Sequence, residues 1–338
     1  MQTRTTVAGM SQFETETEPF RRELLAHCYR MLGSVAEAED TVQETYLRAW
    51  RAFDHFEGRS SVRTWLYRIA TNACLTALEH RRRRALPSHL GGPSADPSAA
   101  ARADDSVSWL EPMPDALVKP LSGDPAEVVV ARQSLRLALV ASLQHLPARQ
   151  RAVLLLRDVL AFPAAEVAEI LTTTVPAVKS YLQRARAKLD DVAPAEEDFQ
   201  EPADPRQRVL LDRYVRAIET VDVQALRELL HEDLVLEATP GRTWHAGVSV
   251  CLPFLQRQVL DAGRWRMLAT AANGQPAAIS YLRDDTGSYR AFGVIVLTTT
   301  ATAISRINAF GDADLVAAFG FPQVLPTEEE DDVAEPTC

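Results

Sequence analysis

The side chains with the clearest potential for binding chemistry lie in one basic helix, which the sequence predicts over residues 174–190. Thr174 can cap its first turn, and Pro176 fits there because a missing N–H costs nothing at that position. Apolar residues recur at steps of three and four and make one stripe for burial. They are Val175, Val178, Leu182, Ala185 and Leu189. Donors and acceptors occupy the other faces: Lys179, Ser180, Gln183, Arg184, Arg186 and Lys188.

A shorter helix is predicted immediately upstream, from Pro163 to Leu171, with Val167, Ile170 and Leu171 facing inward. A helix, a short turn and a basic helix form the helix-turn-helix pattern, whose second helix enters the major groove of DNA. The alternative for this segment is a surface helix with solvated charges.

Charge is spread unevenly along the 338 residues, whose formal net charge is −10. Residues 20–84 carry +4 and residues 126–189 carry +5. The acidic segments are 1–19 with −2, 85–125 with −4 and 190–338 with −13. Two locally basic modules can attract phosphate even though the whole chain is acidic.

The four cysteines, Cys28, Cys74, Cys251 and Cys338, form no CxxC pair and no zinc-ligand spacing, so we expect no metal and no cofactor. The N-terminus has no apolar signal core, and no apolar run approaches the roughly 18–20 residues that cross a membrane. We therefore expect a cytoplasmic protein without a membrane partner.

The first module is predicted to be helical from Phe20 to Arg84. Its apolar residues mark one helix that closes at Gly33, a second over residues 36–53 and a third over residues 62–80. The third helix ends in the basic run 81–84, which consists of four arginines.

Residues 85–125 hold seven of the twenty prolines, which is typical of a linker between domains. Within this linker, residues 109–115 read WLEPMPD and are more apolar than a plain spacer. Trp109, Leu110 and Pro112 favour docking onto a neighbouring domain over an incidental apolar stretch, because exposed apolar groups gain by burial.

The pattern changes after residue 206. Two helices, over residues 209–221 and 223–230, precede four strand-like runs that start near Leu234, Ala277, Tyr289 and Ala303. Helices followed by strands predict an α+β domain with a curved antiparallel sheet. The last twelve residues contain six acids and no base, and we expect them to form a disordered tail.

Three motifs in order resemble the extracytoplasmic-function (ECF) sigma factors of bacterial RNA polymerase. Residues 30–50 resemble the helix of sigma region 2, residues 57–74 resemble the helix that opens the −10 element, and residues 146–157 resemble the entry to region 4. Beyond residue 206 the chain resembles the cone-shaped SnoaL-like (NTF2-like) fold, and the pairing is closest to the sigma-G type of actinobacteria.

The resemblance implies a multidomain fold: two all-α sigma modules, a region 2 helical bundle and a region 4 helix-turn-helix, followed by an α+β cone domain. The expected division is a disordered N-terminus over 1–18, region 2 over 19–84, the linker over 85–125, region 4 over 126–190, a connector over 191–205, the SnoaL-like domain over 206–325 and an acidic tail over 326–338.

The resemblance also implies the partners: core RNA polymerase, through its beta and beta-prime subunits, and promoter DNA. It assigns Asp40, Gln43 and Glu44 to contact with the coiled-coil clamp of the largest polymerase subunit. Without the resemblance, the default interpretation of these residues is a solvated acidic face.

Reading of the −35 duplex is expected from Lys179, Ser180, Gln183 and Arg184, while Arg186 and Lys188 clamp phosphate. Capture of unpaired −10 bases needs stacking planes and cations. The candidates are Arg63, Trp65, Arg68 and Asn72, followed along the backbone by Arg81, Arg82, Arg83 and Arg84. For Trp65, a core position is favoured over stacking.

Folds of the SnoaL-like class often hold a pocket, so a small-molecule ligand is a further candidate partner. Polar or aromatic candidates to line the pocket are Tyr214, Trp244, His245, Asn273, Tyr281 and Asn308. No pair of them has a spacing that demands catalysis, so we expect no enzyme activity. The rival from another class is a SnoaL-like cyclase or isomerase fused to a DNA-binding module. A second rival is a plain helix-turn-helix repressor, which needs no polymerase-binding helix, so residues 30–50 argue against it.

Overall fold

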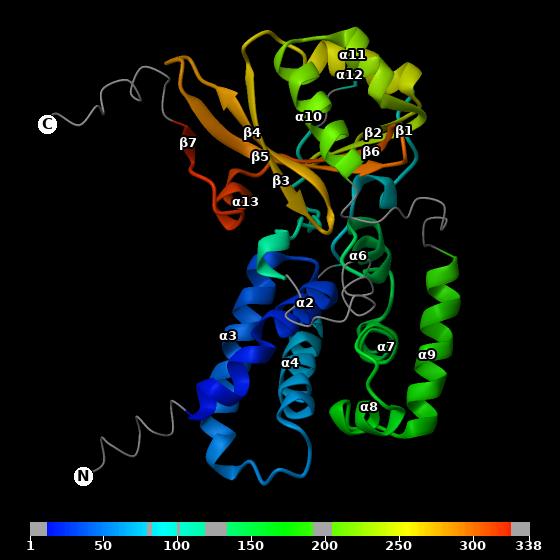
Figure 1. The fold of residues 1–338 in the computed structure, drawn as a ribbon. Coiled ribbons are helices and arrows are strands. Elements are labelled where there is room, and N and C mark those ends of the chain that lie inside the picture. The colour runs from blue at the N-terminus through cyan, green and yellow to red at the C-terminus, as the bar shows by residue number, and fades with distance from the viewer. Residues whose placement is uncertain (1–11, 80–82, 100–101, 119–133, 192–204, 326–338) are drawn as a thin grey trace, which may run out of the picture. The chain divides into compact units, whose positions relative to one another are not determined.

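The computed structural model describes residues 12–79, 83–99, 102–118, 134–191 and 205–325, and the chain forms two compact units (Figure 1). The first unit comprises residues 1–84 and 115–194, and the second comprises residues 85–114 and 195–338. The chain therefore passes from the first unit into the second at residue 85 and returns at residue 115.

The first half of the first unit contains the helices that the sequence predicts: α2 (Arg21–Leu32), α3 (Val35–Ala52) and α4 (Val62–Glu79). Short 3-10 turns, η1 (Glu18–Phe20) and η2 (Phe53–His55), precede α2 and follow α3. Gly33 ends α2 in the left-handed region, at φ 74°, where glycine costs little. Ser34 then starts α3, because its hydroxyl accepts a hydrogen bond from the Glu37 N–H at 3.2 Å.

Residues 12–17 are helical, which corrects the expectation that the whole segment 1–18 is disordered. The physical reason is Phe13, whose ring is only 6% exposed. It packs edge-on against Tyr46, Trp50 and Phe53 at centroid distances of 6.1, 5.4 and 5.2 Å. Such pairs add to the hydrophobic gain of burial.

Among residues 134–191, the second half of the first unit consists of α6 (Leu137–Leu143), α7 (Ala148–Leu154), the π-helical turn η5 (Leu155–Val159), α8 (Ala164–Ile170) and α9 (Val175–Asp190). The predicted helix-turn-helix is α8 and α9. A short turn, η4 (Asp115–Leu117), begins this part of the unit.

The second unit is the α+β domain that the sequence predicts. Its helices are α10 (Pro205–Glu219), α11 (Val223–Leu229), α12 (Val248–Gln258) and α13 (Ala313–Ala318). Its strands are β1 (Leu230–Thr239), β2 (Trp244–Ala246), β3 (Trp265–Ala272), β4 (Gln275–Arg283), β5 (Tyr289–Thr299), β6 (Ile304–Phe310) and β7 (Val324–Leu325). The 3-10 turn η3 (Pro87–His89) belongs to the linker.

The strands form one sheet in the order β2-β1-β6-β5-β4-β3, with β7 on β5. The expectation of an antiparallel sheet is wrong for one pair, because β1 and β6 run parallel. These two strands are far apart in the sequence, and the chain between them returns through α12 and the β3–β4–β5 meander. Alternation along a single strand carries no information about such a pairing.

The hydrophobic core lies between α10, α11 and α12 and one face of the sheet (Figure 1). On β1, Leu234 and Leu236 belong to this core, so Glu237 points to the opposite face. The linker, cyan in Figure 1, runs beside β1.

Candidate functional site

The three candidates for polymerase contact lie on α3, whose opposite side is buried through Ala38, Val42 and Ala49. Asp40 and Gln43 are exposed, and Glu44 is half-exposed. Glu44 accepts a hydrogen bond from Arg48 one turn on, at 2.7 Å. The helix therefore brings all three together on its outward side.

The same side carries two exposed apolar side chains that sequence reasoning missed. Leu47 is 51% exposed and Trp50 is 37% exposed. Leu47 follows Gln43 by four residues and Trp50 follows Leu47 by three, so helical spacing could have identified them as an extension of the face. Exposed apolar groups next to polar ones are typical of a protein-binding surface.

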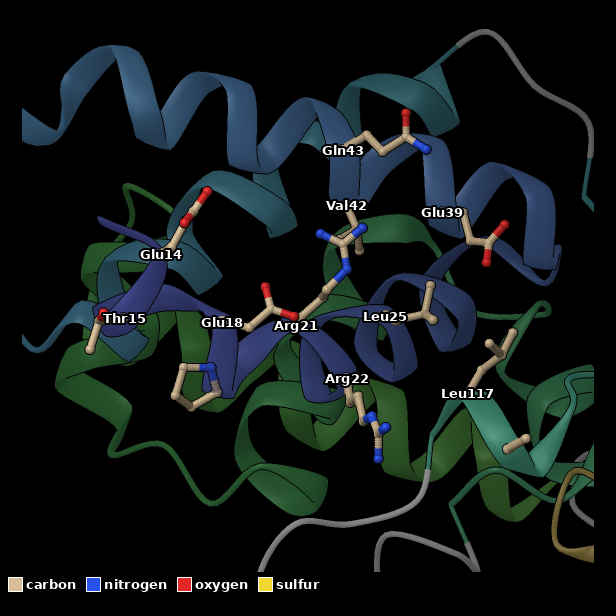
Figure 2. Close-up of a pocket in the computed structure, with 12 residues that line it drawn as sticks. Glu14, Thr15, Glu18, Arg21, Arg22, Leu25, Glu39, Val42, Gln43 and Leu117 are labelled. Atoms are coloured by element: carbon tan, nitrogen blue, oxygen red, sulfur yellow. The ribbon is translucent and has the colours of Figure 1, made fainter. Parts of the chain in front are cut away.

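A cavity of about 730 Å³ lies beside this face, between α2, α3 and the turn η4 (Figure 2). Gln43, Val42 and Glu39 line it from α3, and Leu25 lines it from α2. Leu117 of η4 closes another part of the wall. The segment that leaves the linker thus lies at the edge of the candidate polymerase-binding face.

On α4, the structure separates the candidates for −10 contact. Trp65 is 6% exposed and packs on Phe53 and Phe56 at centroid distances of 6.4 and 4.8 Å, so it belongs to the core. Arg68 and Asn72 are exposed on the outward side.

Arg63 is half-buried, and its Nε donates to the carboxylate of Glu23 at 3.0 Å. That carboxylate raises the pKa of the Arg63 guanidinium even though burial opposes the charge. The guanidinium also lies over the ring of Tyr67, 5.1 Å from its centroid. It is thus held in one place by partners on two helices.

The basic run after α4 is only partly visible, because Arg81 and Arg82 lie outside the described residues. Arg83 Nη1 is 2.9 Å from His145 Nδ1, and Arg84 donates to Glu37 at 2.7 Å. Arg84 is therefore neutralised by an acid of α3 in this structure.

The recognition-helix candidate α9 has the local structure that its sequence predicts. Thr174 Oγ1 accepts from the Ala177 N–H at 3.3 Å, and Val178 and Ala185 are buried. All six candidate DNA-contacting side chains are exposed: Lys179, Ser180, Gln183, Arg184, Arg186 and Lys188.

Two of the six have partners within the chain. The Arg184 guanidinium lies 5.1 Å from the centroid of the Tyr181 ring. Arg186 makes a two-pronged ion pair with Asp158, at 2.9 and 2.7 Å. This pair fixes the Arg186 side chain against η5, whereas Lys179 and Gln183 face outward.

In the second unit the linker is part of the fold. Leu110, Pro112 and Met113 are buried, and Trp109 is half-buried with its Nε1 donating to Asp104 O at 3.3 Å. Ala85 pairs with Trp109 as an isolated bridge, so the start of the linker lies beside the start of the 109–115 segment.

One anchor of the linker is the carboxylate of Glu237, a residue that is 1% exposed. The Ser88 backbone N–H donates to one carboxylate oxygen at 2.8 Å. Arg306 pairs with the other oxygen, which also accepts from Asn308 Nδ2 at 3.3 Å. Sequence reasoning missed Glu237 and Arg306, since an acid on a strand gives no signal that it is buried.

A second anchor joins Asn273 to Met113. The Met113 N–H donates to Asn273 Oδ1 at 2.8 Å, and the Asn273 N–H donates to Met113 O at 2.9 Å. Asn273 sits at φ 57°, in the left-handed region that asparagine tolerates better than most residues. The turn between β3 and β4 therefore presents both groups to the linker.

Strand β2 makes a third contact with the linker. Trp244 Nε1 donates to Gly91 O at 2.8 Å, and His245 Nδ1 is 3.2 Å from Ser94 O. The His245 ring lies against Phe254 at 4.5 Å, which places it between the linker and α12.

The six pocket candidates thus lie in three places. Tyr214 is in the core between helices and sheet, and Tyr281 donates to Pro322 O at 2.9 Å near α13. The other four, Trp244, His245, Asn273 and Asn308, contact the linker or the Glu237 carboxylate that holds it.

Two known protein families match the two halves of the first unit. The model of Sigma-70 region 2 matches residues 17–84, and that of Sigma-70 region 4 matches residues 136–189. The region 2 match covers α2 to α4, and the region 4 match covers α6 to α9.

Two relatives from Mycobacterium tuberculosis extend the match. The chain is 49% identical over 316 residues to the ECF RNA polymerase sigma factor SigG, across 93% of this chain and 85% of that one. It is 32% identical over 222 residues to SigJ, across 65% of this chain and 62% of that one. The crystal structure of SigJ aligns with a TM-score of 0.56 at 24% identity, over 93% of this chain and 99% of that one.

The chain belongs to the family of ECF RNA polymerase sigma factors. The expected fold class, two all-α sigma modules and an α+β SnoaL-like domain, is confirmed. Among the residues that the structure describes, no helix is long and apolar enough to cross a membrane.

The Asn273 anchor leads to a prediction about the linker. Asn273→Gly keeps the left-handed backbone but removes the acceptor, which leaves the buried Met113 N–H unsatisfied at a cost of about 1–3 kcal/mol. We expect faster limited proteolysis between residues 85 and 114, measured by mass spectrometry of the fragments. Asn273→Asp, which keeps an acceptor, is the control, and equal cleavage of all three chains would contradict the anchor.

Proposed function

We propose that this chain directs core RNA polymerase to specific promoters, with α3 as the polymerase contact, α9 as the −35 reader and the outward side of α4 as the −10 reader. The observation that carries the proposal is the presence, in one chain, of an exposed acid-and-amide face on α3 and an exposed donor-rich face on α9. A plain repressor needs the second face but not the first.

The polymerase contact is proposed to include the beta and beta-prime subunits, with Asp40, Gln43 and Glu44 against the coiled-coil clamp of the largest subunit. Acids and an amide can pair with a basic helix, and Leu47 adds apolar area beside them. Since promoter DNA is the other partner, we propose a cytoplasmic location.

The −35 contact is proposed to use Lys179, Ser180, Gln183 and Arg184 for base edges, because they lie in the first half of α9. Lys188 lies further along and fits phosphate. Arg186 is paired with Asp158. It can contact phosphate only if this ion pair opens; otherwise it holds α9 against η5 while the neighbouring side chains of α9 bind DNA.

The −10 contact is proposed to use Arg63, Arg68 and Asn72, with Arg83 and Arg84 beyond them on the phosphates. Trp65 is left out because it is in the core. Arg63 is held by Glu23 and lies over the rings of Tyr67 and Phe162, so it must leave one of these rings to stack on an unpaired base.

The SnoaL-like domain is proposed to regulate initiation rather than catalyse a reaction. Residues 205–325 contain twelve arginines and twelve acidic residues, so this region has no excess of acid that could repel DNA or attract the basic modules. A regulatory role is supported by the hydrogen bonds that join this domain to the linker, through Glu237, Asn273 and β2. A ligand of this domain stays a prediction.

Within the described residues of the second unit, no observation favours the enzyme alternative. Catalysis needs an acid or base within reach of a substrate. The core between helices and sheet is built from apolar residues and Tyr214, and burial raises the pKa of that phenol well above its usual value. The domain's other candidates, His245 and Asn308, are committed to the linker or its anchor.

The polymerase contact is tested by Asp40→Ala combined with Gln43→Ala. Both side chains are exposed, so we expect unchanged helical content and an affinity for core polymerase lower by about tenfold or more, because several polar contacts are lost together. The measurement is competition with a labelled sigma factor, and Glu79→Ala, an exposed acid at the end of α4, is the control. Unchanged affinity of the double variant would refute the assignment of α3.

The −35 contact is tested by Lys179→Ala and Arg184→Ala in gel shifts with duplexes selected by the holoenzyme. Loss of a base contact should cost about 1–3 kcal/mol on the selected sequence, whereas loss of a phosphate contact weakens all sequences alike. Arg149→Ala, an exposed arginine of α7, is the control. If both α9 variants bind like the parent chain, the recognition surface lies elsewhere.

The regulatory role is tested by Ser88→Pro, which removes the N–H that donates to Glu237, with Ser88→Ala as the control that keeps it. Proline removes this donor, sets its ring carbon against the carboxylate and disfavours the helical conformation of Pro87, so the contact between η3 and Glu237 is lost. We expect the amount of run-off transcript from a selected promoter to differ from that of the parent chain for Ser88→Pro and to equal it for Ser88→Ala. Equal transcription by all three chains at every concentration would rule out regulation through this anchor.

A further inference from the structure

Helix α10 of the second unit carries a row of basic side chains that the proposed function does not use. Its inner side packs on the sheet and on α11 through Leu210, Tyr214 and Ile218 (Figure 1). Its outer side has a stripe at steps of three and four residues, and every member of this stripe is exposed: Arg206, Val209, Arg213 and Arg216. The α10 stripe thus contains three guanidinium groups and no carboxylate.

Ion pairs along the helix leave the charge of the α10 stripe mostly unbalanced. Asp212 pairs at 3.7 Å with Arg208, which lies outside the stripe. Glu228 of α11 approaches Arg213 only to 4.0 Å, and both side chains are at least half exposed. Exposed ion pairs contribute little, so a phosphate can replace Glu228 as the partner of Arg213. Within the described residues, no carboxylate lies at ion-pair distance from Arg216.

The arginines at the start of α10 do not help the helix itself. Arg206 and Arg208 lie in its first turn, which contains no acid. The N-terminal end of a helix carries a partial positive charge and is stabilised by acids, such as Glu23 in α2 and Glu37 in α3. The basic first turn of α10 adds positive charge to an end that is already positive. Local choices that weaken an element are expected at functional sites, and this end of a helix favours an anion as ligand.

The α10 stripe has dimensions that suit duplex DNA. From Arg206 to Arg216 it is about 15 Å long, at a rise of about 1.5 Å per residue. Duplex DNA carries one phosphate charge per about 1.7 Å of its axis, so each of the three guanidinium groups can reach a phosphate. Val209 lies between them and is 56% exposed, the largest fraction of any large apolar side chain in the described part of the chain. It can lie against a sugar between two phosphate contacts.

We propose that the α10 stripe binds the phosphate backbone of duplex DNA without reading its sequence, because guanidinium groups match phosphate in charge and in shape. The proposal rests on the proposed function, since polymerase and α9 bring DNA to this chain. Helix α9 ends at Asp190 and α10 begins at Pro205. DNA that α9 holds is therefore present at a high effective concentration for α10. The SnoaL-like domain then adds a salt-dependent share of the promoter affinity besides holding the linker.

The test combines Arg206→Gln, Arg213→Gln and Arg216→Gln in the full chain. Glutamine removes the charge and is a good helix former, so α10 should keep its structure. The matched control loses the same charge through glutamine at three exposed arginines elsewhere in the second unit: Arg257, Arg264 and Arg283. Each chain is assembled with core polymerase, and binding to a labelled promoter duplex is measured by fluorescence anisotropy at several salt concentrations that keep the duplex closed.

Each lost phosphate contact lowers the slope of log affinity against log salt concentration by about 0.9, so the stripe variant should lose about 2–3 of the parent slope. The loss should be the same on the selected promoter and on a scrambled duplex of equal length, because phosphates carry no sequence. The control should keep the parent slope. An unchanged slope of the stripe variant, or an equal loss in the control, would overturn the proposal.

Lys179→Ala with Arg184→Ala separates a failure at α10 from a failure of −35 reading. If the stripe variant keeps the parent slope while this double variant loses the preference for the selected duplex, the α10 contact is refuted and the −35 role of α9 stands. If the double variant keeps that preference, the −35 role fails, and a lowered slope of the stripe variant still supports the α10 contact.

A crosslinking measurement does not depend on removing charges. Val209→p-benzoylphenylalanine places a photoreactive ring in the middle of the α10 stripe, and the holoenzyme bound to labelled promoter duplex is irradiated. We expect a covalent link between position 209 and DNA, and none from the same amino acid at Val324, an exposed apolar residue of β7. The absence of a DNA link at position 209, or a link to a polymerase subunit in its place, would overturn the proposal.

Discussion

The buried carboxylate of Glu237 is the group on which the position of the linker depends. It is 1% exposed and is balanced by Arg306, Asn308 and the N–H of Ser88. A buried charge that loses a donor is costly, and a hydrogen bond to a charged group is worth about 1.5–3 kcal/mol. The linker therefore cannot leave β1 without leaving one carboxylate oxygen unsatisfied.

The linker that Glu237 anchors is covalently joined to both sigma modules. Region 2 ends at Arg84, and the next residue, Ala85, pairs with Trp109 in the second unit. The chain returns to the first unit only after Pro114, which bridges to Ala272 of β3. Residues 85–114 of the segment that joins region 2 to region 4 are thus held at both ends within the second unit. Any change in that unit that moves β1 or the β3–β4 turn must act on this connection.

Much of the fold could be predicted, because helix caps, helix breaks and strand-forming runs depend on residues that are neighbours in the sequence. Gly33 and Ser34 mark the break between α2 and α3, and Thr174 and Pro176 mark the start of α9, since capping depends on neighbouring residues alone. The strand runs near Ala277 and Tyr289 were recognisable because apolar β-formers follow one another there.

The parts that could not be predicted depend on partners distant in the sequence. The parallel pairing of β1 and β6 and the burial of Glu237 depend on residues about 70 and 150 positions away, and no local pattern encodes them. The same holds for Arg63, whose spacing marks it as a candidate DNA contact but cannot show that Glu23 and Phe162 enclose it. Residue type alone marks the six pocket candidates. Four of them contact the linker or the Glu237 carboxylate that holds it, because the path of the linker is a tertiary feature that residue type does not encode.

The claim that the SnoaL-like domain holds the linker is tested most directly by amide hydrogen exchange in the full chain. The N–H groups of Ser88, Leu110 and Met113 donate to Glu237, Ala85 and Asn273 and should be protected by orders of magnitude relative to an unstructured peptide. In a chain with Glu237→Gln, which weakens the charged acceptor, protection should fall first at Ser88. Exchange of all three amides in the parent chain at the rate of an unstructured peptide would contradict the account.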